Sequence, residues 1–260
     1  STYRMYYDHR EPLRLMPSHR VLAMNRGEKE GFLKVALDVD KEKAQQLVRY
    51  GFVQQTGSPA CEYVAQACDD AYTRLIAPSL DTELRAELTD KASAAAIRVF
   101  ALNLRPLLMQ PPVRGKVAMG LDPGIRTGCK VAVVDETGRV LDTGVIFPLP
   151  SHGKVAQAKE TVKRMIQKHH VGIVAIGNGT AGRETEQFFV EVMKELALGD
   201  ALKYMVVSEA GASVYSASKL AAEEFPQFDV SLRSAVSIAR RLQDPLAELV
   251  KIDPKAIGVG

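Results

Sequence analysis

Apolar and polar positions change their spacing once along the chain, close to the Pro111-Pro112 pair. Before this pair, apolar residues recur mostly at every third or fourth position, which predicts amphipathic helices. After it, short apolar runs rich in valine and isoleucine are separated by helical stretches, which predicts strands connected by helices. The pattern therefore predicts a mainly helical first part and an α/β second part.

The first part is expected to contain four helices and one strand. The expected helices lie at 19–26, 41–50, 59–77 and about 83–104. Ser18 is a suitable N-cap for the first helix, Gly27 is expected to end it, and Pro106 is expected to end or kink the last one. Alternating apolar positions predict a strand at 32–39. No residue pattern in this part is typical of a catalytic site.

The second part predicts a mixed sheet with helices on both faces. Strands are expected at 117–121, 130–134, 139–147, 172–176 and 204–207, and helices at 155–169, 184–196, 210–224 and 230–242. The turn at 135–138 predicts an antiparallel hairpin, whereas connections through helices predict parallel pairing for the later strands. The first strand should then lie centrally, beside the strand at 172–176. This order of elements, with five strands flanked by helices, is typical of the RNase H-like fold.

The composition is that of a soluble globular chain, with 46% hydrophobic and 25% charged residues. No apolar run approaches the roughly 18–20 residues that a membrane helix needs, so a membrane is not an expected partner. Three cysteines without a secretion signal indicate free thiols and a cytoplasmic protein. The formal net charge of +3 is too small to predict nucleic-acid binding by itself, so any such surface must be local.

The segment GLDPGIRTG at 120–128 is the sharpest candidate for a functional site. Asp122 ends an apolar strand, and the following Pro-Gly pair predicts a tight turn that holds its carboxylate at the rim of the sheet. Arg126 and the backbone amides around Thr127 are placed to face a phosphate. In nucleases of this fold such an aspartate binds Mg²⁺. The alternative is a turn aspartate that accepts hydrogen bonds from nearby amides.

A glycine-rich loop at 177–183 forms a second candidate, because it leads from a buried strand into a helix. Amides at a helix N-terminus attract anions, and Arg183 would add a cation with two parallel donors. Glu184 and Glu186 suit the start of a helix but would repel a phosphate. An ordinary loop is therefore the alternative.

Two further acids follow along the chain. Glu209 lies where the last strand passes into a helix and is the candidate second metal ligand opposite Asp122; the alternative is an ordinary first-turn glutamate. Asp229 precedes the late helix on which nucleases of this fold carry a third carboxylate, but helix capping explains it fully. Within that helix the exposed candidates are cations, which bind phosphate in preference to Mg²⁺, namely Arg233, Arg240 and Arg241.

Together these segments resemble the Tex family of transcription accessory proteins. The resemblance is carried by LDPGIRTGCK at 121–130, SEAGASVYS at 208–216, AVSIARRLQDPLAELVK at 235–251, PSHR at 17–20 and NRGE at 25–28. It implies a fragment of a longer protein whose members continue into helix-hairpin-helix and S1 RNA-binding domains. The implied parts are the mainly helical central region at 1–113, a YqgF domain related to RuvC resolvases at 114–244, and the start of a linker at 245–260.

The resemblance carries over the acids of the fold unequally. Asp122 matches the first acid, and Glu209 matches the acid that YqgF domains place after the last strand. Resolvases instead carry a glutamate at the end of the strand that here reads Ile176-Gly177-Asn178. On the last helix Arg233 stands where the motif Asp-Ser-Ala has its aspartate, and an arginine at a metal-ligand position would repel Mg²⁺.

Three functions follow from these residues. The favoured one is a transcription accessory factor that binds RNA or DNA through a degenerate RNase H-like domain, which does not cleave and requires no cofactor. Its phosphate contacts are expected from Arg126, Thr127, Lys130, Arg183 and Arg233. The first alternative is a structure-selective nuclease dependent on Mg²⁺ or Mn²⁺, with Asp122 and Glu209 as metal ligands and Asp229 as the third catalytic acid. The second is a docking platform, formed by the helical first part, for transcription or ribosomal proteins.

Overall fold

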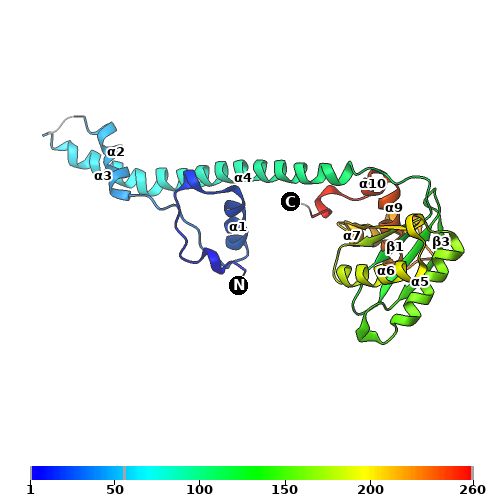
Figure 1. Ribbon diagram of the computed structural model, residues 1–260. Coiled ribbons are helices and arrows are strands. Elements are labelled where there is room, and N and C mark those ends of the chain that lie inside the picture. Colours follow the sequence, from blue (N-terminus) through cyan, green and yellow to red (C-terminus); the bar gives the residue numbers. More distant parts are fainter. Residues whose placement is uncertain (1, 55–56, 259–260) are drawn as a thin grey trace. The chain divides into compact units, whose positions relative to one another are not determined.

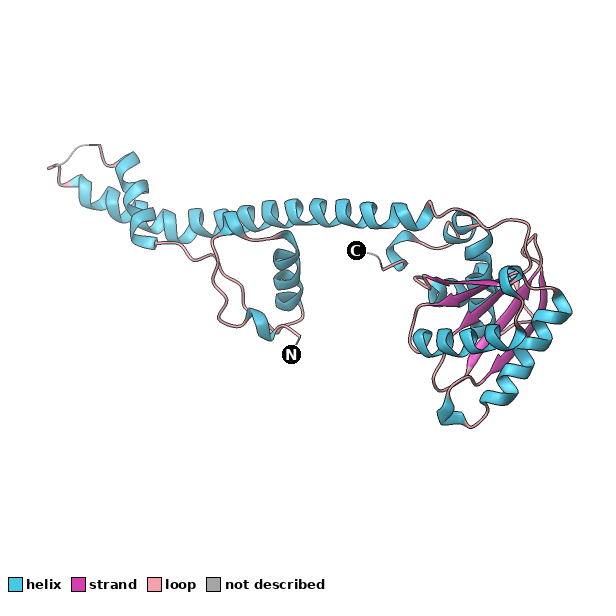
Figure 2. Cartoon of the chain, viewed as in Figure 1, coloured by secondary structure: helices cyan, strands magenta, loops and turns pink. Residues whose placement is uncertain are grey.

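The computed structural model describes residues 2–54 and 57–258 (Figure 1). They form two units, one ending at Ala101 and the other beginning at Leu102, so the division falls inside the long helix α4 (Ala77–Leu108). The first unit is helical and the second contains the sheet (Figure 2). None of the described helices is both long enough and apolar enough to cross a membrane.

Helices account for most of the first unit, as the sequence predicts. Its elements are η1 (Arg4–Tyr6), η2 (Leu13–Leu15), α1 (Ser18–Lys29), α2 (Lys41–Phe52), α3 (Ala60–Ala71), the π-helical turn η3 (Tyr72–Ile76) and α4 as far as Ala101. Asp40 caps α2 by accepting a hydrogen bond from Lys43 N at 3.1 Å. An ion pair between Arg49 and Asp69 joins α2 to α3.

Two local predictions near α1 are wrong. Residues 32–39 pair with no strand of the described chain; instead Val35 N donates a hydrogen bond to Glu28 Oε1 at 3.1 Å. The alternating apolar residues therefore belong to an extended segment that packs against helices and not to a strand of a sheet. Helix α1 also continues through Gly27, which packs against Tyr3 and Leu33. This glycine serves close packing inside the helix and does not end it.

The helices expected at 59–77 and 83–104 are also wrong as separate elements, because α3, η3 and α4 follow one another without a break. Pro78 lies just after the π-helical turn, where the regular hydrogen-bond ladder is already interrupted, so its missing amide hydrogen costs little. Thr82 donates to Pro78 O at 3.0 Å from within α4, so no new helix begins at this position. Pro106 lies inside the last turn, and α4 ends two residues later at Leu108.

The second unit is built on a five-stranded sheet in the order β3-β2-β1-β4-β5. Its strands are β1 (Ala118–Asp122), β2 (Cys129–Val134), β3 (Val140–Ile146), β4 (Ile173–Gly177) and β5 (Lys203–Val207). The first three strands pair antiparallel, whereas β4 and β5 run parallel to β1. The predicted hairpin and the central first strand are confirmed. This is the mixed sheet of the RNase H-like fold.

Helices cover both faces of this sheet (Figure 1). Helices α5 (Val155–His169) and α6 (Gly182–Leu196) share a buried cluster with Met119 and Leu121 of β1. On the other face, α9 (Val230–Gln243) shares a cluster with Ala118. Alternate residues of β1 therefore serve opposite layers. Shorter elements are η4 (Pro150–His152), η5 (Gly199–Ala201), α7 (Ala212–Ser216), α8 (Lys219–Glu224), α10 (Pro245–Leu249) and η6 (Pro254–Ala256).

The single helix expected at 210–224 is wrong, because α7 and α8 are separate. The side chain of Ser218 accepts a hydrogen bond from Ala221 N at 3.2 Å and so caps a new helix after α7 has ended. Tyr215 of α7 is buried in one cluster with Leu249 and Ile252. The segment that follows α9 therefore packs on the same unit as the sheet.

Gly120 sets how closely α9 approaches β1. A Cβ at this position would lie 2.8 Å from Ala239 N and closer still to Ala235 O, both backbone atoms of α9. We expect Gly120→Ala to lower the free energy of unfolding by about 3 kcal/mol, because these backbone atoms cannot move without separating the two layers. Chemical denaturation followed by circular dichroism measures this loss.

Gly172→Ala is the matched control in the same unit, since a Cβ there would meet the flexible side chain of Lys116 at 3.4 Å. It should change the free energy of unfolding by less than about 0.5 kcal/mol. Equal losses in the two variants would show that contact at Gly120 does not set the spacing of the layers.

Candidate functional site

Asp122 is the last residue of β1 and lies where the parallel strands β1 and β4 end. Its carboxylate is mostly buried, and this burial raises the pKa of Asp122 to about 6. A hydrogen bond with the Ser234 side chain opposes the shift, the charge of Glu209 adds to it, and the charges of Lys130 and Arg241 lower the pKa again. The carboxylate therefore stands in one charge cluster with residues from β2, α9 and the loop after β5.

Glu209 reaches this edge of the sheet from the loop after β5. Its backbone amide donates a hydrogen bond to Asn178 Oδ1 at 3.1 Å, which ties the loop to the end of β4. Its carboxylate lies against two glycines: a Cβ on Gly177 would be 2.8 Å from Glu209 Oε2, and a Cβ on Gly179 would be 2.7 Å from the same atom. Because Gly177 and Gly179 have no side chains, the end of β4 leaves space for the carboxylate of Glu209.

Two residues at the start of α9 act on the backbone of their own unit. Asp229 is exposed and caps α9 by accepting a hydrogen bond from Leu232 N at 2.8 Å. Arg233 donates from Nε to Phe225 O at 3.1 Å and from Nη1 to Ser216 O at 3.4 Å. Neither residue is therefore directed by these contacts to the carboxylates of the candidate site.

The residues at this edge do not fit a divalent metal ion. Such an ion is held by several oxygen ligands, and the sequence resemblance led us to expect three carboxylates. Within residues 2–54 and 57–258, no group of three His, Cys, Asp or Glu side chains is arranged to hold a metal. Asp122 and Glu209 meet here, but the charges of Lys130 and Arg241 act on the same place. A metal ion would add to positive charge already present.

Arg241 is the residue of this site that sequence reasoning misplaced, since the exposed phosphate-binding side chain expected there is buried. It is 4% exposed, and its Nη1 donates to Ser208 O at 2.8 Å and to Ala210 O at 2.7 Å. Arg240 is also engaged, with Nε donating to Gly138 O at 2.7 Å. The missed signal is spacing: position 241 lies two helical turns after Ser234 and so shares its buried face.

The residues expected to contact phosphate are placed unequally. Lys130 is buried, and its Nζ donates to Thr127 O at 2.9 Å and to Gly128 O at 3.0 Å. Arg126 and Thr127 are exposed on the loop after β1, and Arg183 is exposed at the start of α6. Within the described chain neither arginine forms a hydrogen bond or an ion pair. Because β1 and β4 are parallel neighbours, the loops that follow them lie at one edge of the sheet.

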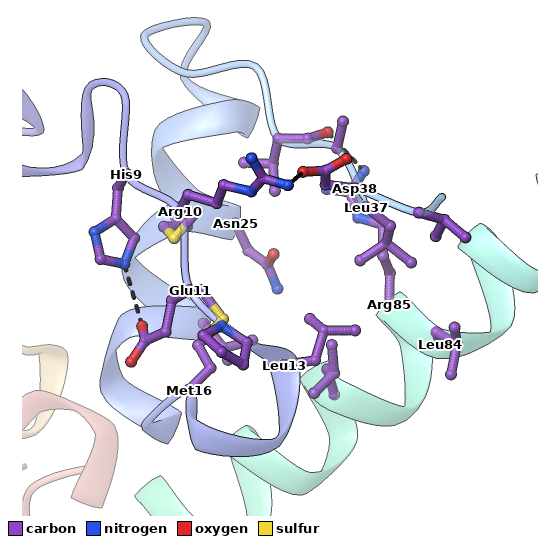
Figure 3. A pocket seen from close by; sticks show the side chains of 17 residues that line it. His9, Arg10, Glu11, Leu13, Met16, Asn25, Leu37, Asp38, Leu84 and Arg85 are labelled. Atoms are coloured by element: carbon purple, nitrogen blue, oxygen red, sulfur yellow. Dashed lines mark hydrogen bonds and ion pairs between the residues drawn. The ribbon is translucent and has the colours of Figure 1, made fainter. Parts of the chain in front are cut away.

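A cavity of about 530 Å³ lies in the helical unit and shares no residue with this edge of the sheet (Figure 3). Most of its lining is apolar and comes from η2, α1, α4 and the segment at 35–39. Figure 3 shows polar residues of the lining paired with one another, Arg10 with Asp38 in an ion pair and the His9 ring with the Glu11 carboxylate. The cavity therefore offers apolar surface and neutralised charges, which makes it a weaker candidate for chemistry.

Comparison with protein families accounts for both units. Residues 116–243 match the Tex protein YqgF-like domain, and residues 1–100 match the family described as Tex central region-like. The chain belongs to the Tex family. The resemblance seen in its segments is thereby confirmed. Among solved structures, T. thermophilus RuvC in complex with a Holliday junction substrate has a TM-score of 0.36 and 17% identity, over 48% of this chain and 90% of that one. A likeness at this level says nothing about activity.

The Tex relatives are much longer than this chain. It is 52% identical to the uncharacterized protein YdcI of Bacillus subtilis, over 100% of the chain and 36% of that protein. It is 46% identical to protein tex of Bordetella pertussis, over 100% of the chain and 34% of that protein. The S1 RNA-binding domain-containing protein 1 of Homo sapiens is 41% identical over 95% of the chain and 25% of its own length. The chain therefore spans about a third of the bacterial relatives.

Because the pKa of Asp122 is raised, replacing this acid should increase the free energy of unfolding by an amount that depends on pH. An acid whose pKa is higher in the folded chain penalises folding once it is ionised, so the penalty grows as the pH rises from about 4 through about 6. We expect Asp122→Asn to gain about 3 kcal/mol of stability relative to the parent between pH 4 and pH 8. Unfolding free energies measured at both pH values give this difference.

Asp142→Asn is the control of opposite sign. Burial raises the pKa of Asp142, but hydrogen bonds with His169 and Lys168 outweigh it and hold the pKa below its usual value. Its stabilising contribution is present at neutral pH and is lost as the pH falls through the lowered pKa, so this variant should lose stability at pH 8. The same pH trend in both variants would contradict the opposite environments of the two acids.

Proposed function

We propose that this part of a Tex protein binds RNA or DNA at the carboxyl edge of its RNase H-like sheet and does not cleave it. The observation that carries the proposal is that the charges of buried Lys130 and Arg241 act on Asp122, and that of Arg241 also on Glu209, while Arg126 and Arg183 stay exposed on the neighbouring loops. Buried positive charge offsets the acids, and exposed positive charge remains for phosphate.

Phosphate binding suits the two exposed arginines. Each guanidinium offers parallel donors to phosphate oxygens, and neither forms an ion pair within the described residues that would have to break. Thr127 and the amides at the start of α6 add uncharged donors at the same edge. Lys130 and Arg233, also expected to contact phosphate, already donate to backbone oxygens. We therefore assign the phosphate contacts to Arg126, Thr127 and Arg183.

The relatives add support of a general kind. The human relative carries RNA binding in its printed name, and the Bordetella relative is named tex. Because the chain covers only part of each, nucleic-acid binding by the whole protein includes segments outside this one. A role in transcription and a cytoplasmic location are part of the same proposal.

Removing the exposed arginines tests the site. We expect Arg126→Ala and Arg183→Ala each to weaken binding of labelled RNA and branched DNA, and to reduce the slope of log affinity against log salt by about one unit. Fluorescence anisotropy at several salt concentrations measures both quantities. Arg139→Ala is the control for loss of a surface charge, because Arg139 is also exposed but pairs with Asp135 in the turn at the opposite end of β2. It should leave both quantities unchanged.

Two outcomes would contradict the proposal. Unchanged affinity and salt slope in both arginine variants would remove the phosphate site. Cleavage of branched DNA or RNA that requires Mg²⁺ or Mn²⁺ and disappears in Asp122→Asn would establish the nuclease alternative, with Glu209 and Asp229 as the next acids to replace.

Exposed apolar residues on the helical unit favour a second role as a protein-docking platform. Leu47 and Tyr50 on α2 are 74% and 88% exposed, and Tyr63 on α3 is 76% exposed. We expect a Leu47→Glu/Tyr50→Glu variant to lose recovery of transcription or ribosomal proteins from cell extract, because charge opposes apolar docking. Quantitative mass spectrometry measures recovery, with Lys43→Glu as the exposed control on the same helix. Equal recovery with the parent would exclude this surface.

A further inference from the structure

Arg241 is a buried cation with part of its guanidinium group unused. Its Nη1 donates to the carbonyl oxygens of Ser208 and Ala210, the residues on either side of Glu209. Its Nε and Nη2 are also buried, and neither has a hydrogen-bond partner in the described chain. Hydrogen bonds at one nitrogen do not replace the water lost by a whole guanidinium, so opposite charge must compensate.

Three carboxylates supply this compensation. Burial lowers the pKa of Arg241, and the charges of Glu248, Glu209 and Asp122 oppose that shift. Glu248 of α10 is 4% exposed; its Oε2 pairs with Lys251 at 2.9 Å, while its Oε1 has no partner among the residues described. The arginine is therefore under the charge of the acidic pair and of a third, buried acid of α10.

We propose that Arg241 is the resident counter-ion of Asp122 and Glu209, and that it takes the electrostatic place which a divalent metal ion has in a three-carboxylate site. This rests on the proposed function, because a site that holds its own cation does not need a metal to offset its acids. The inference names Arg241 as the residue that offsets these acids. It also adds Glu248 of α10 to the residues of the site.

The hydrogen bonds of Arg241 make this counter-ion difficult to exchange. Since one nitrogen holds the carbonyls on both sides of Glu209, the arginine cannot leave without releasing the loop that carries this acid. A divalent ion that entered between the acids would be repelled by this fixed positive charge, which acts in a buried and poorly screened place. The two cations therefore exclude each other, and the side chain at position 241 decides which one is present.

A double-mutant cycle on the 260-residue chain tests the charge coupling. Arg241→Met removes the charge and the carbonyl bonds, and Asp122→Asn removes one facing charge with little change of shape. We expect Arg241→Met to lower Tm, and to lower it less in the Asp122→Asn background, because one acid that would be left uncompensated is then absent. Arg241→Lys keeps the charge and is the control. Its Tm should be higher than that of Arg241→Met, and this difference should be larger with Asp122 than in the Asp122→Asn background.

Binding of Mn²⁺ is a second measurement, which should not change if Arg241 has only a structural role. In equilibrium titrations followed by the electron paramagnetic resonance of free Mn²⁺, the parent should take up none at this site. Arg241→Met should gain Mn²⁺ binding that Asp122→Asn abolishes. If Arg241→Met does not fold, Arg241→Gln replaces it, since it removes the charge but keeps a donor for the Ser208 and Ala210 carbonyls.

Two results would overturn the counter-ion. One is Mn²⁺ uptake by the parent that Asp122→Asn abolishes, because metal and arginine would then coexist. The other is an equal Tm loss from Arg241→Met with and without Asp122→Asn, because the arginine would then act only through its backbone bonds. Nucleic-acid binding separates this inference from the proposed function: unchanged binding in Arg126→Ala and Arg183→Ala would remove the function, while a coupled cycle would still support the counter-ion.

Discussion

Helix α9 can bring its polar residues to the end of β1 because Gly120 has no side chain. The backbone of α9 lies where a Cβ of Gly120 would be, so the helix rests directly on the sheet. One end of this contact places Ser234 beside Asp122, and two turns later the same helix face places Arg241 beneath the loop after β5. A larger residue in place of Gly120 would move the helix away from the sheet. Ser234 would then lie farther from Asp122, and Arg241 farther from the loop after β5. The electrostatic interactions of the site therefore depend on the close spacing of α9 and the sheet.

The carboxyl edge of the sheet also shows how an acid can be supplied by a neighbouring strand. Strand β4 ends without an acid, yet the space beside Gly177 and Gly179 is not empty of negative charge, because the carboxylate of Glu209 lies there. At this edge the acid therefore comes from the loop after β5 and not from the end of β4. The third acid is different: Asp229 serves as a helix cap and Arg233 binds backbone carbonyls. Asp122 and Glu209 therefore act on a buried arginine, and neither Asp229 nor Arg233 is directed to them by its hydrogen bonds.

The sheet was predictable because each strand has a local signal, such as the unbroken apolar run of β4 and the polar turn before β3. Prediction failed where contacts distant in sequence decide the outcome. Within the described residues, the extended segment at 32–39 has no partner strand. The break between α7 and α8 has a local cause, because Ser218 caps a new helix, but the helical spacing at 210–224 continues through it. In the site, the positions of Asp122 and Glu209 at strand ends already indicated that they would approach each other. The burial of Arg241 had only its helical spacing from Ser234 as a signal, and a charged residue on an amphipathic helix is ordinarily exposed. The acids that act on it come from three separate segments.

Local charge balance, and not the small net charge of the chain, determines what this edge can attract. In the proposed site, a phosphate that approaches the loops after β1 and β4 would meet the exposed Arg126 and Arg183, while the charges of buried cations act on Asp122 and Glu209. Without those cations the two carboxylates would repel the same phosphate over a distance of a few ångströms, where water screens little. A metal ion solves this problem in a nuclease and at the same time supplies the chemistry of cleavage. A guanidinium held by backbone carbonyls offsets the acids without offering a coordination site for water or for the scissile phosphate. The same substitution of cations would therefore preserve attraction for nucleic acid and remove the means of cutting it.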